Sequence, residues 1–139
     1  FTVRWMTGYV SEQANLRTEE RLSRFGYWSW EDRGEPTWPV HDGRPEAVVV
    51  NAATRPQGQP GDEYYIPAAG RRGGETFRER WRRAREIGPK FALVVSWNEW
   101  VGGEQPSAEV SKDLEPSEEF GTFYLDLLEE EIAKFKGLK

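Results

Sequence analysis

The chain has 139 residues, with 19 lysines and arginines against 24 aspartates and glutamates, so its formal net charge is −5. This acidic balance argues against a surface dedicated to nucleic acid or to an anionic membrane, because either would need a basic face. The most apolar stretch, residues 91–97, is far shorter than the roughly 20 residues that span a bilayer. We therefore expect a soluble protein with neither nucleic acid nor a membrane as a partner.

The sequence has no cysteine and one histidine, which excludes disulfides, thiolate zinc sites and cysteine nucleophiles and argues against a histidine-rich metal site. It also has no phosphate-binding loop motif and no serine-hydrolase elbow. We expect no metal and no cofactor. Its 7 tryptophans, 5 tyrosines and 7 phenylalanines suit the stacking of flat hydroxylated ligands, although packing in the core explains any single tryptophan equally well.

Four strands are predicted, at residues 2–6, 26–30, 47–52 and 91–97. The second pair holds continuous apolar runs without alternation, which is typical of strands buried on both faces of a parallel sheet. Because the chain opens directly on the first strand, we expect the sequence to begin inside a domain.

Two amphipathic helices are predicted. Residues 75–87 place Phe77, Trp81 and Ala84 on one stripe, and the last helix is expected to open at Ser117 as its N-cap. Residues 53–74 are expected to form one long loop, of the kind that is usually functional in a compact domain. Within it, Tyr64-Tyr65 and Arg71-Arg72 are candidates for a lid.

The alternation of strands and helices favours a parallel sheet with crossover helices. An eight-unit β/α barrel takes about 250 residues, so this length corresponds to about four and a half units. The sequence therefore predicts α/β architecture, with residues 1–139 as the C-terminal half of a (β/α)8 TIM-type barrel. Its open edges would require the missing N-terminal half, in the same polypeptide or as a second chain.

The motif that carries chemistry is the end of the last strand, where Trp97-Asn98-Glu99-Trp100 follows an apolar run. A carboxylate at the C-terminal end of a barrel strand points into the mouth where active sites of this fold lie. The flanking rings can exclude water, and the amide can bind a sugar hydroxyl. Glu99 is therefore the first candidate catalytic residue, the alternative being that it only ties a loop to the rim.

Catalysis by a carboxylic acid or carboxylate often uses a second carboxyl group as well. Candidates are Glu31, Asp32 and Glu104, or an acid from the absent half of the barrel. Glu31 is preferred as the second catalytic residue because it too would follow the end of a strand, although a place in a surface loop explains it equally well. Further candidate substrate-binding residues lie at expected strand ends or beside the motif: Arg4, Trp5, Trp28, Trp30, Trp97, Asn98, Trp100 and Glu104.

Residues 96–100, Ser-Trp-Asn-Glu-Trp, resemble the last-strand signature of barrel glycoside hydrolases of the endo-α-mannosidase and α-1,3-glucanase type and of their uncharacterised bacterial relatives. The similarity extends over residues 4–6, 26–30, 76–81 and the final helix, but only 97–100 is specific. The resemblance implies a glycoside hydrolase acting on a poly- or oligosaccharide, with Glu99 as its first catalytic carboxylate. Such enzymes are often exported, but the sequence assigns no compartment.

The sequence departs from the endo-α-mannosidase group at one position. That group has a second catalytic glutamate three residues after the first, whereas this chain has Gly102. Two alternatives therefore stay open: a non-catalytic carbohydrate-binding barrel that has lost its second carboxylate, and a purely structural barrel fragment.

Overall fold

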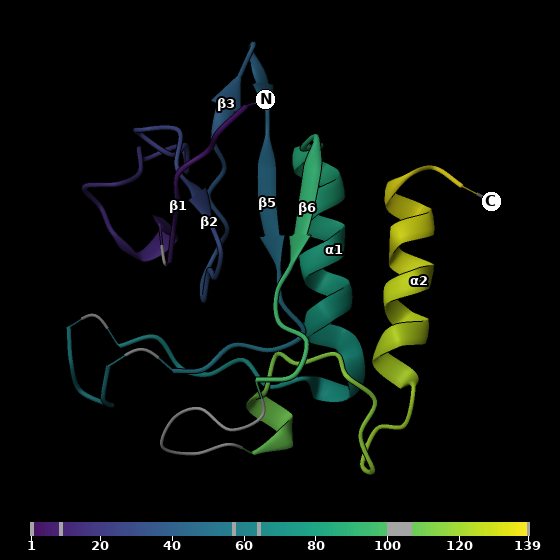
Figure 1. The fold of residues 1–139 in the computed structure, drawn as a ribbon. Helices are drawn as coiled ribbons and strands as arrows, with labels where there is room; N and C mark the ends of the chain where they lie inside the picture. Colours follow the sequence, from purple (N-terminus) through teal and green to yellow (C-terminus); the bar gives the residue numbers. More distant parts are fainter. Residues whose placement is uncertain (1, 9, 57, 64, 100–106, 139) are drawn as a thin grey trace.

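A computed structural model describes residues 2–8, 10–56, 58–63, 65–99 and 107–138 of the chain. Its described strands form three two-stranded sheets, of which the first and last are parallel and the middle one is an antiparallel hairpin. The pairs are β1 (Met6–Thr7) with β2 (Trp28–Ser29), β3 (Val40–His41) with β4 (Arg44–Pro45), and β5 (Ala47–Val50) with β6 (Phe91–Val94). Figure 1 shows β1, β2, β5 and β6 side by side.

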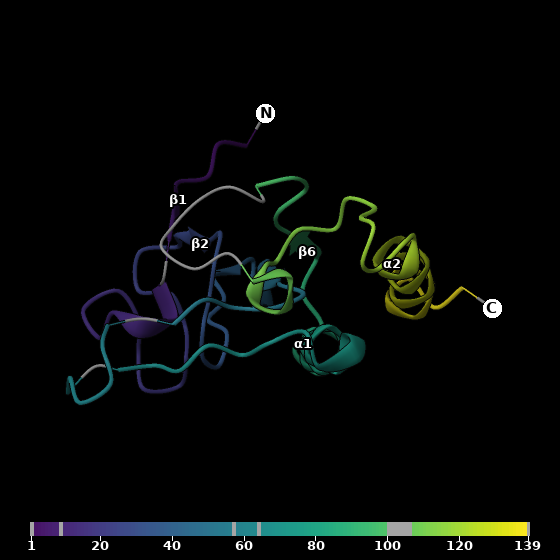
Figure 2. The same ribbon diagram turned by 90° about the horizontal axis from the view of Figure 1, so that it is seen from below.

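The longest parallel pair, β5 and β6, is joined by a crossover that contains α1 (Glu75–Ile87), and α2 (Phe123–Phe135) follows β6. Both helices lie on the same side of the molecule, away from β1 and β2 (Figure 2). Within the described residues, neither helix has the length and hydrophobicity that a bilayer crossing needs. The architecture is therefore an α/β mixture in which the two apolar runs pair in parallel, as expected. The expected burial on both faces holds for β5 but is wrong for β6, where Phe91 is exposed and the other residues are half-buried.

The hydrophobic core lies between β5 and the two helices. Val48 and Val50 pack with Phe77 and Trp81 of α1 and with Leu127 of α2, all of them buried. Phe77 and Trp81 are four residues apart, so they share one helix face, and their rings meet edge to face at 6.1 Å. Each large apolar side chain buried here stabilises the fold by roughly 1.5–3 kcal/mol.

The predicted helix at 75–87 is confirmed with the same bounds, because Gly88 ends it in the left-handed conformation at φ 66°. The expected start of the last helix at Ser117 is wrong. The Ser117 hydroxyl accepts the backbone N–H of Phe120 within a separate turn, which Gly121 completes at φ 55°. The helix begins only at Phe123.

The strands are shorter than the sequence predicts, and backbone hydrogen bonds explain where β5 and β6 end. After β6, the carbonyl of Trp97 accepts the N–H groups of Leu114 and Glu115 instead of continuing the pairing with β5. After β5, the chain turns into the long loop, where Thr54 pairs with Ala69. Both strands therefore give way to loops at the same end of the sheet, which is called the carboxyl end below.

Candidate functional site

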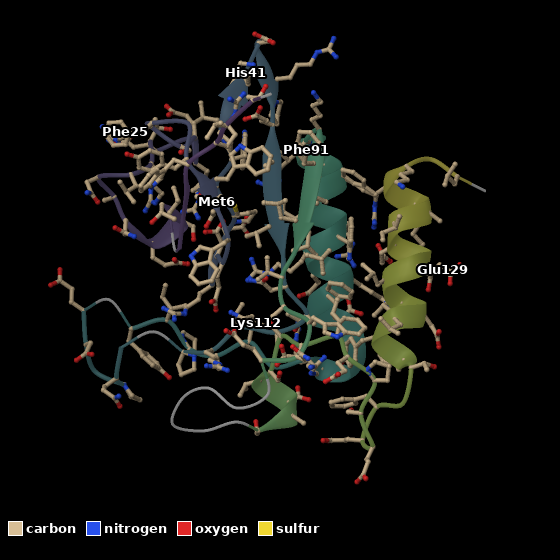
Figure 3. All side chains as sticks on the ribbon, in the orientation of Figure 1. Met6, Phe25, His41, Phe91, Lys112 and Glu129 are labelled. Atoms are coloured by element: carbon tan, nitrogen blue, oxygen red, sulfur yellow. The ribbon has the colours of Figure 1, made fainter. Side chains whose placement is uncertain are left out.

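Glu31 is buried at the carboxyl end of the sheet, where it forms an ion pair. It lies two residues beyond β2 and is only 3% exposed, so the surface-loop interpretation of this residue is wrong. The ammonium of Lys112, itself buried, donates to Glu31 Oε2 at 2.6 Å. Figure 3 shows Lys112 beyond the ends of β5 and β6. A contact across 81 positions of sequence thus joins the segment after β2 to a segment after β6.

Asp113, the neighbour of Lys112, holds the turn that carries Glu99. Its Oδ1 atom accepts the hydroxyl of Ser96 at 2.5 Å and the backbone N–H of Glu99 at 2.7 Å, and its Oδ2 atom accepts the hydroxyl of Ser111 at 2.6 Å. Burial opposes ionisation of Asp113, but the hydrogen bonds from Ser111, Ser96 and Glu99 outweigh it and lower the pKa of its carboxyl. A charged carboxylate therefore fixes the turn after β6.

Arg71 ties the long loop to the same segment and is not an exposed lid residue. Its side chain is fully buried, and its guanidinium donates to the backbone carbonyls of Ala108 at 2.8 Å and Asp113 at 2.6 Å. The guanidinium also lies 4.2 Å from the ring centre of Tyr124 and 5.0 Å from that of Phe120. The guanidinium of Arg71 thereby connects the loop after β5 to the loop after β6.

The end of β6 presents its polar motif outward. Trp97, Asn98 and Glu99 are exposed, with 51% of Trp97 accessible. The expected shielding of the Glu99 carboxyl from water is therefore not seen in the described residues. Trp100 and Glu104, two further predicted site residues, lie outside the described residues.

Trp30 presents a second aromatic surface at this end. It is 46% exposed, and the ammonium of Lys112 lies 6.0 Å from the centre of its ring. Glu31, Lys112 and Trp30 therefore form one group, with a buried ion pair beside a partly open indole. An aromatic face next to polar groups can bind a ligand that has both an apolar face and polar groups.

The indole of Trp30 lies against the backbone of Gly8, so close that a Cβ atom on residue 8 would overlap its Nε1 atom. We expect Gly8→Ala to lower the free energy of unfolding by about 1–3 kcal/mol, because the ring must move. Urea denaturation measures the change. Trp30→Leu in the same chain should remove most of that penalty, and a Gly8→Ala penalty that is the same with and without Trp30 would contradict this contact.

Asp32, another candidate for the second carboxyl group, is hydrogen-bonded within the fold. It is buried, and it accepts the backbone N–H groups of Ser11 and Thr37 and the hydroxyl of Ser29. Burial raises the pKa of its carboxyl, partly offset by these hydrogen bonds. Its two oxygens are occupied by loop backbone and by β2, which leaves Glu31 as the acid of this segment that faces Lys112.

Arg4 and Trp28 lie at the opposite end of β5, around Glu46. The Arg4 guanidinium binds both oxygens of the Glu46 carboxylate at 2.7 Å, and the Trp28 indole N–H donates to Glu46 Oε2 at 2.9 Å. Trp5 is exposed nearby, with its ring centre 6.5 Å from that of Tyr27. The structure thus brings these three predicted substrate-binding residues together with each other, but not with Glu31.

The hydrogen bonds from Arg4, opposed by burial, lower the pKa of Glu46 to about 2. Its pKa in the folded state therefore lies below its unfolded value, so Glu46 adds stability above about pH 4.5 and loses it as the pH falls toward 2. We expect Glu46→Gln to cost roughly 1.5–3 kcal/mol at pH 7 and much less near pH 2. Urea denaturation at both pH values measures this, with the exposed Glu118→Gln as control, and a cost that does not change with pH would contradict it.

A hollow of about 580 Å³ also lies at the end of the molecule near Glu46, lined by His41, Asp42, Arg44, Pro45, Glu46, Gly88, Pro89 and Lys90. Apart from the buried Glu46, its charged lining residues are exposed and carry both signs, and it lies away from the Trp97–Glu99 turn. Among the described residues, no three His, Asp or Glu side chains gather as metal ligands would.

Sequence reasoning missed Lys112 and Asp113, the residues that join the site. They lie in a polar stretch after residues 100–106, with no periodicity that predicts burial, so no pattern in the sequence pointed to them. Arg71 was the one such residue with some indication in the sequence, because it lies in a loop that was expected to be functional. A scan of protein-family models, a search of curated proteins and a search of solved structures each found no match to this chain.

Proposed function

We propose that the chain is part of a β/α-barrel glycoside hydrolase whose catalytic carboxylates are Glu99 and Glu31. The observation that supports this most is the shared segment 111–113. Through Lys112 it binds the carboxylate of Glu31, and through Asp113 it binds the backbone of Glu99. The carboxylate of Glu31 and the backbone that carries Glu99 are thus held by one short segment at one end of the sheet, which supports a reaction that uses both acids.

The surroundings of the two acids favour different roles for them. Glu31 is buried against the ammonium of Lys112, which pairs with its charged form, so we assign it the nucleophile or base. Glu99 is exposed at the end of the motif, where it can meet the leaving oxygen, so we assign it the acid. Trp30 and Trp97, both about half exposed, would stack on sugar rings.

We also propose that further strands and helices complete this fold as a β/α barrel. The described strands are parallel in two pairs, a crossover helix joins β5 to β6, and each of these four strands has one described hydrogen-bonded partner strand. Open edges of a parallel sheet favour pairing with further strands. We propose that the N-terminal half of the barrel supplies them, in the same polypeptide or as a second chain, and the intact mass of the source protein distinguishes the two.

The test is incubation of the complete protein with a panel of soluble glycans that includes α-mannan and α-1,3-gluco-oligosaccharides. Released reducing ends are measured against time. Product that accumulates in proportion to enzyme supports a hydrolase. No product from any glycan after long incubation, together with no binding by calorimetry, would overturn it.

A second candidate function is carbohydrate binding without cleavage. The exposed rings of Trp30 and Trp97 favour it, because they would bind sugar whether or not a reaction follows. Calorimetric binding of a glycan with no product after long incubation would support this function over hydrolysis.

A further inference from the structure

Asn51 is the first residue after β5, at the carboxyl end of the sheet. Val48, Val50 and Ala52 all belong to the core beneath the helices, and successive side chains of a strand point to opposite faces. Asn51 therefore lies on the face that turns away from α1 and α2, together with Val49. On the two sides of β5 lie β6, which leads to the Glu99 turn, and β2, which leads to Glu31.

The amide of Asn51 has no hydrogen-bond partner within the part of the chain that the structure describes. The residue is 1% exposed, and neither Oδ1 nor Nδ2 is bonded. Two other buried polar residues near this end do have partners: Thr54 accepts the N–H of Ala69, and Asp113 uses both of its oxygens. A buried amide without partners costs about 1–3 kcal/mol, so an apolar residue would serve the fold better at this position.

We infer that Asn51 is a substrate-binding residue, and that its amide donates to one hydroxyl of a sugar and accepts from a neighbouring hydroxyl. An amide carries a donor and an acceptor side by side, which matches two adjacent hydroxyl groups. This inference rests on the proposed function. The substrate contact it adds comes from the end of β5, in addition to those from the acids that follow β2 and β6.

The first arm of the test compares stability and function in one variant. We expect Asn51→Leu, of similar volume, to raise the thermal midpoint by a few degrees and to lower glycan binding or turnover at least tenfold. Soluble α-mannan and α-1,3-gluco-oligosaccharides are the probes. Asn15→Leu, at an exposed asparagine, is the control and should change neither quantity.

The second arm observes the amide directly. Selective ¹⁵N labelling of asparagine gives side-chain amide signals that include those of positions 15, 51 and 98. The signal lost in Asn51→Leu identifies Asn51, and it should shift when either probe is added to the wild-type protein while that of Asn15 stays in place.

Each other outcome overturns the inference. If the wild-type protein cleaves a glycan and Asn51→Leu cleaves it equally well, Asn51 is not a substrate contact, although the proposed function stands. If Asn51→Leu and the smaller Asn51→Ser both lower the thermal midpoint, the amide serves the fold. If the wild-type protein neither binds nor cleaves any glycan, the proposed function fails and this inference fails with it.

Discussion

Glu99→Gln in the complete protein is expected to lower turnover of the responsive glycan by about 10²–10⁴-fold, because glutamine cannot give a proton to the leaving oxygen. The substitution keeps the size of the side chain and the backbone N–H that binds Asp113. The side chain is exposed, so the thermal midpoint should hardly change. Initial rates on the glycan panel measure the effect.

Glu119→Gln is the matched control for Glu99→Gln, because it makes the same chemical change at an exposed position outside the Glu99 turn. It should retain full turnover. If Glu99→Gln has unchanged turnover, Glu99 takes no part in the reaction. Turnover that is lost while glycan affinity is kept would place the effect on the chemical step and not on binding.

The largest expected effect on stability is that of Lys112→Met. The substitution leaves the buried carboxylate of Glu31 without its cation, and removing one partner of a buried ion pair typically costs about 3–5 kcal/mol. Urea denaturation of the variant measures the cost. Arg82→Met, which breaks an ion pair with Glu75 in which both side chains are about half exposed, should cost less than about 1 kcal/mol.

A double variant separates the lost charge pairing from lost packing. Lys112→Met together with Glu31→Gln leaves no unpaired buried charge, so it should recover most of the stability that Lys112→Met loses. A double variant that is no more stable than Lys112→Met would show that the lysine acts through its alkyl chain. A single variant as stable as the wild-type protein would contradict the burial of the pair.

The elements that could be predicted from the sequence are those marked by a local pattern of apolar residues. The helix at 75–87 was predicted to the residue because an apolar stripe and a following glycine define both its face and its end. The apolar run at 47–52 predicted β5, although its last residues turn into the loop. The last helix was predicted five residues too early, because Ser117 followed by acids is also typical of a turn, and Gly121 completes that turn.

The candidate site was harder to predict because its contacts join distant parts of the chain. Glu99 could be proposed from its own motif, and Glu31 from its place after a strand. The partner of Glu31 lies 81 positions away in a segment whose polar composition is typical of solvent exposure. Burial of Lys112 depends on that pairing, which no single stretch of sequence encodes. Arg4 and Trp28 likewise bind a residue that is distant in sequence, Glu46 at the other end of β5.

The ties made by Arg71 and Asp113 use only groups of the chain itself. Loops that are already fixed lose little conformational entropy when something binds to them, so more of the contact energy remains as affinity. The rim of the sheet is in this sense preorganised, even though it is built from irregular segments. Substitutions at Arg71 would then weaken binding through disorder of the rim, without removing a single contact to the ligand.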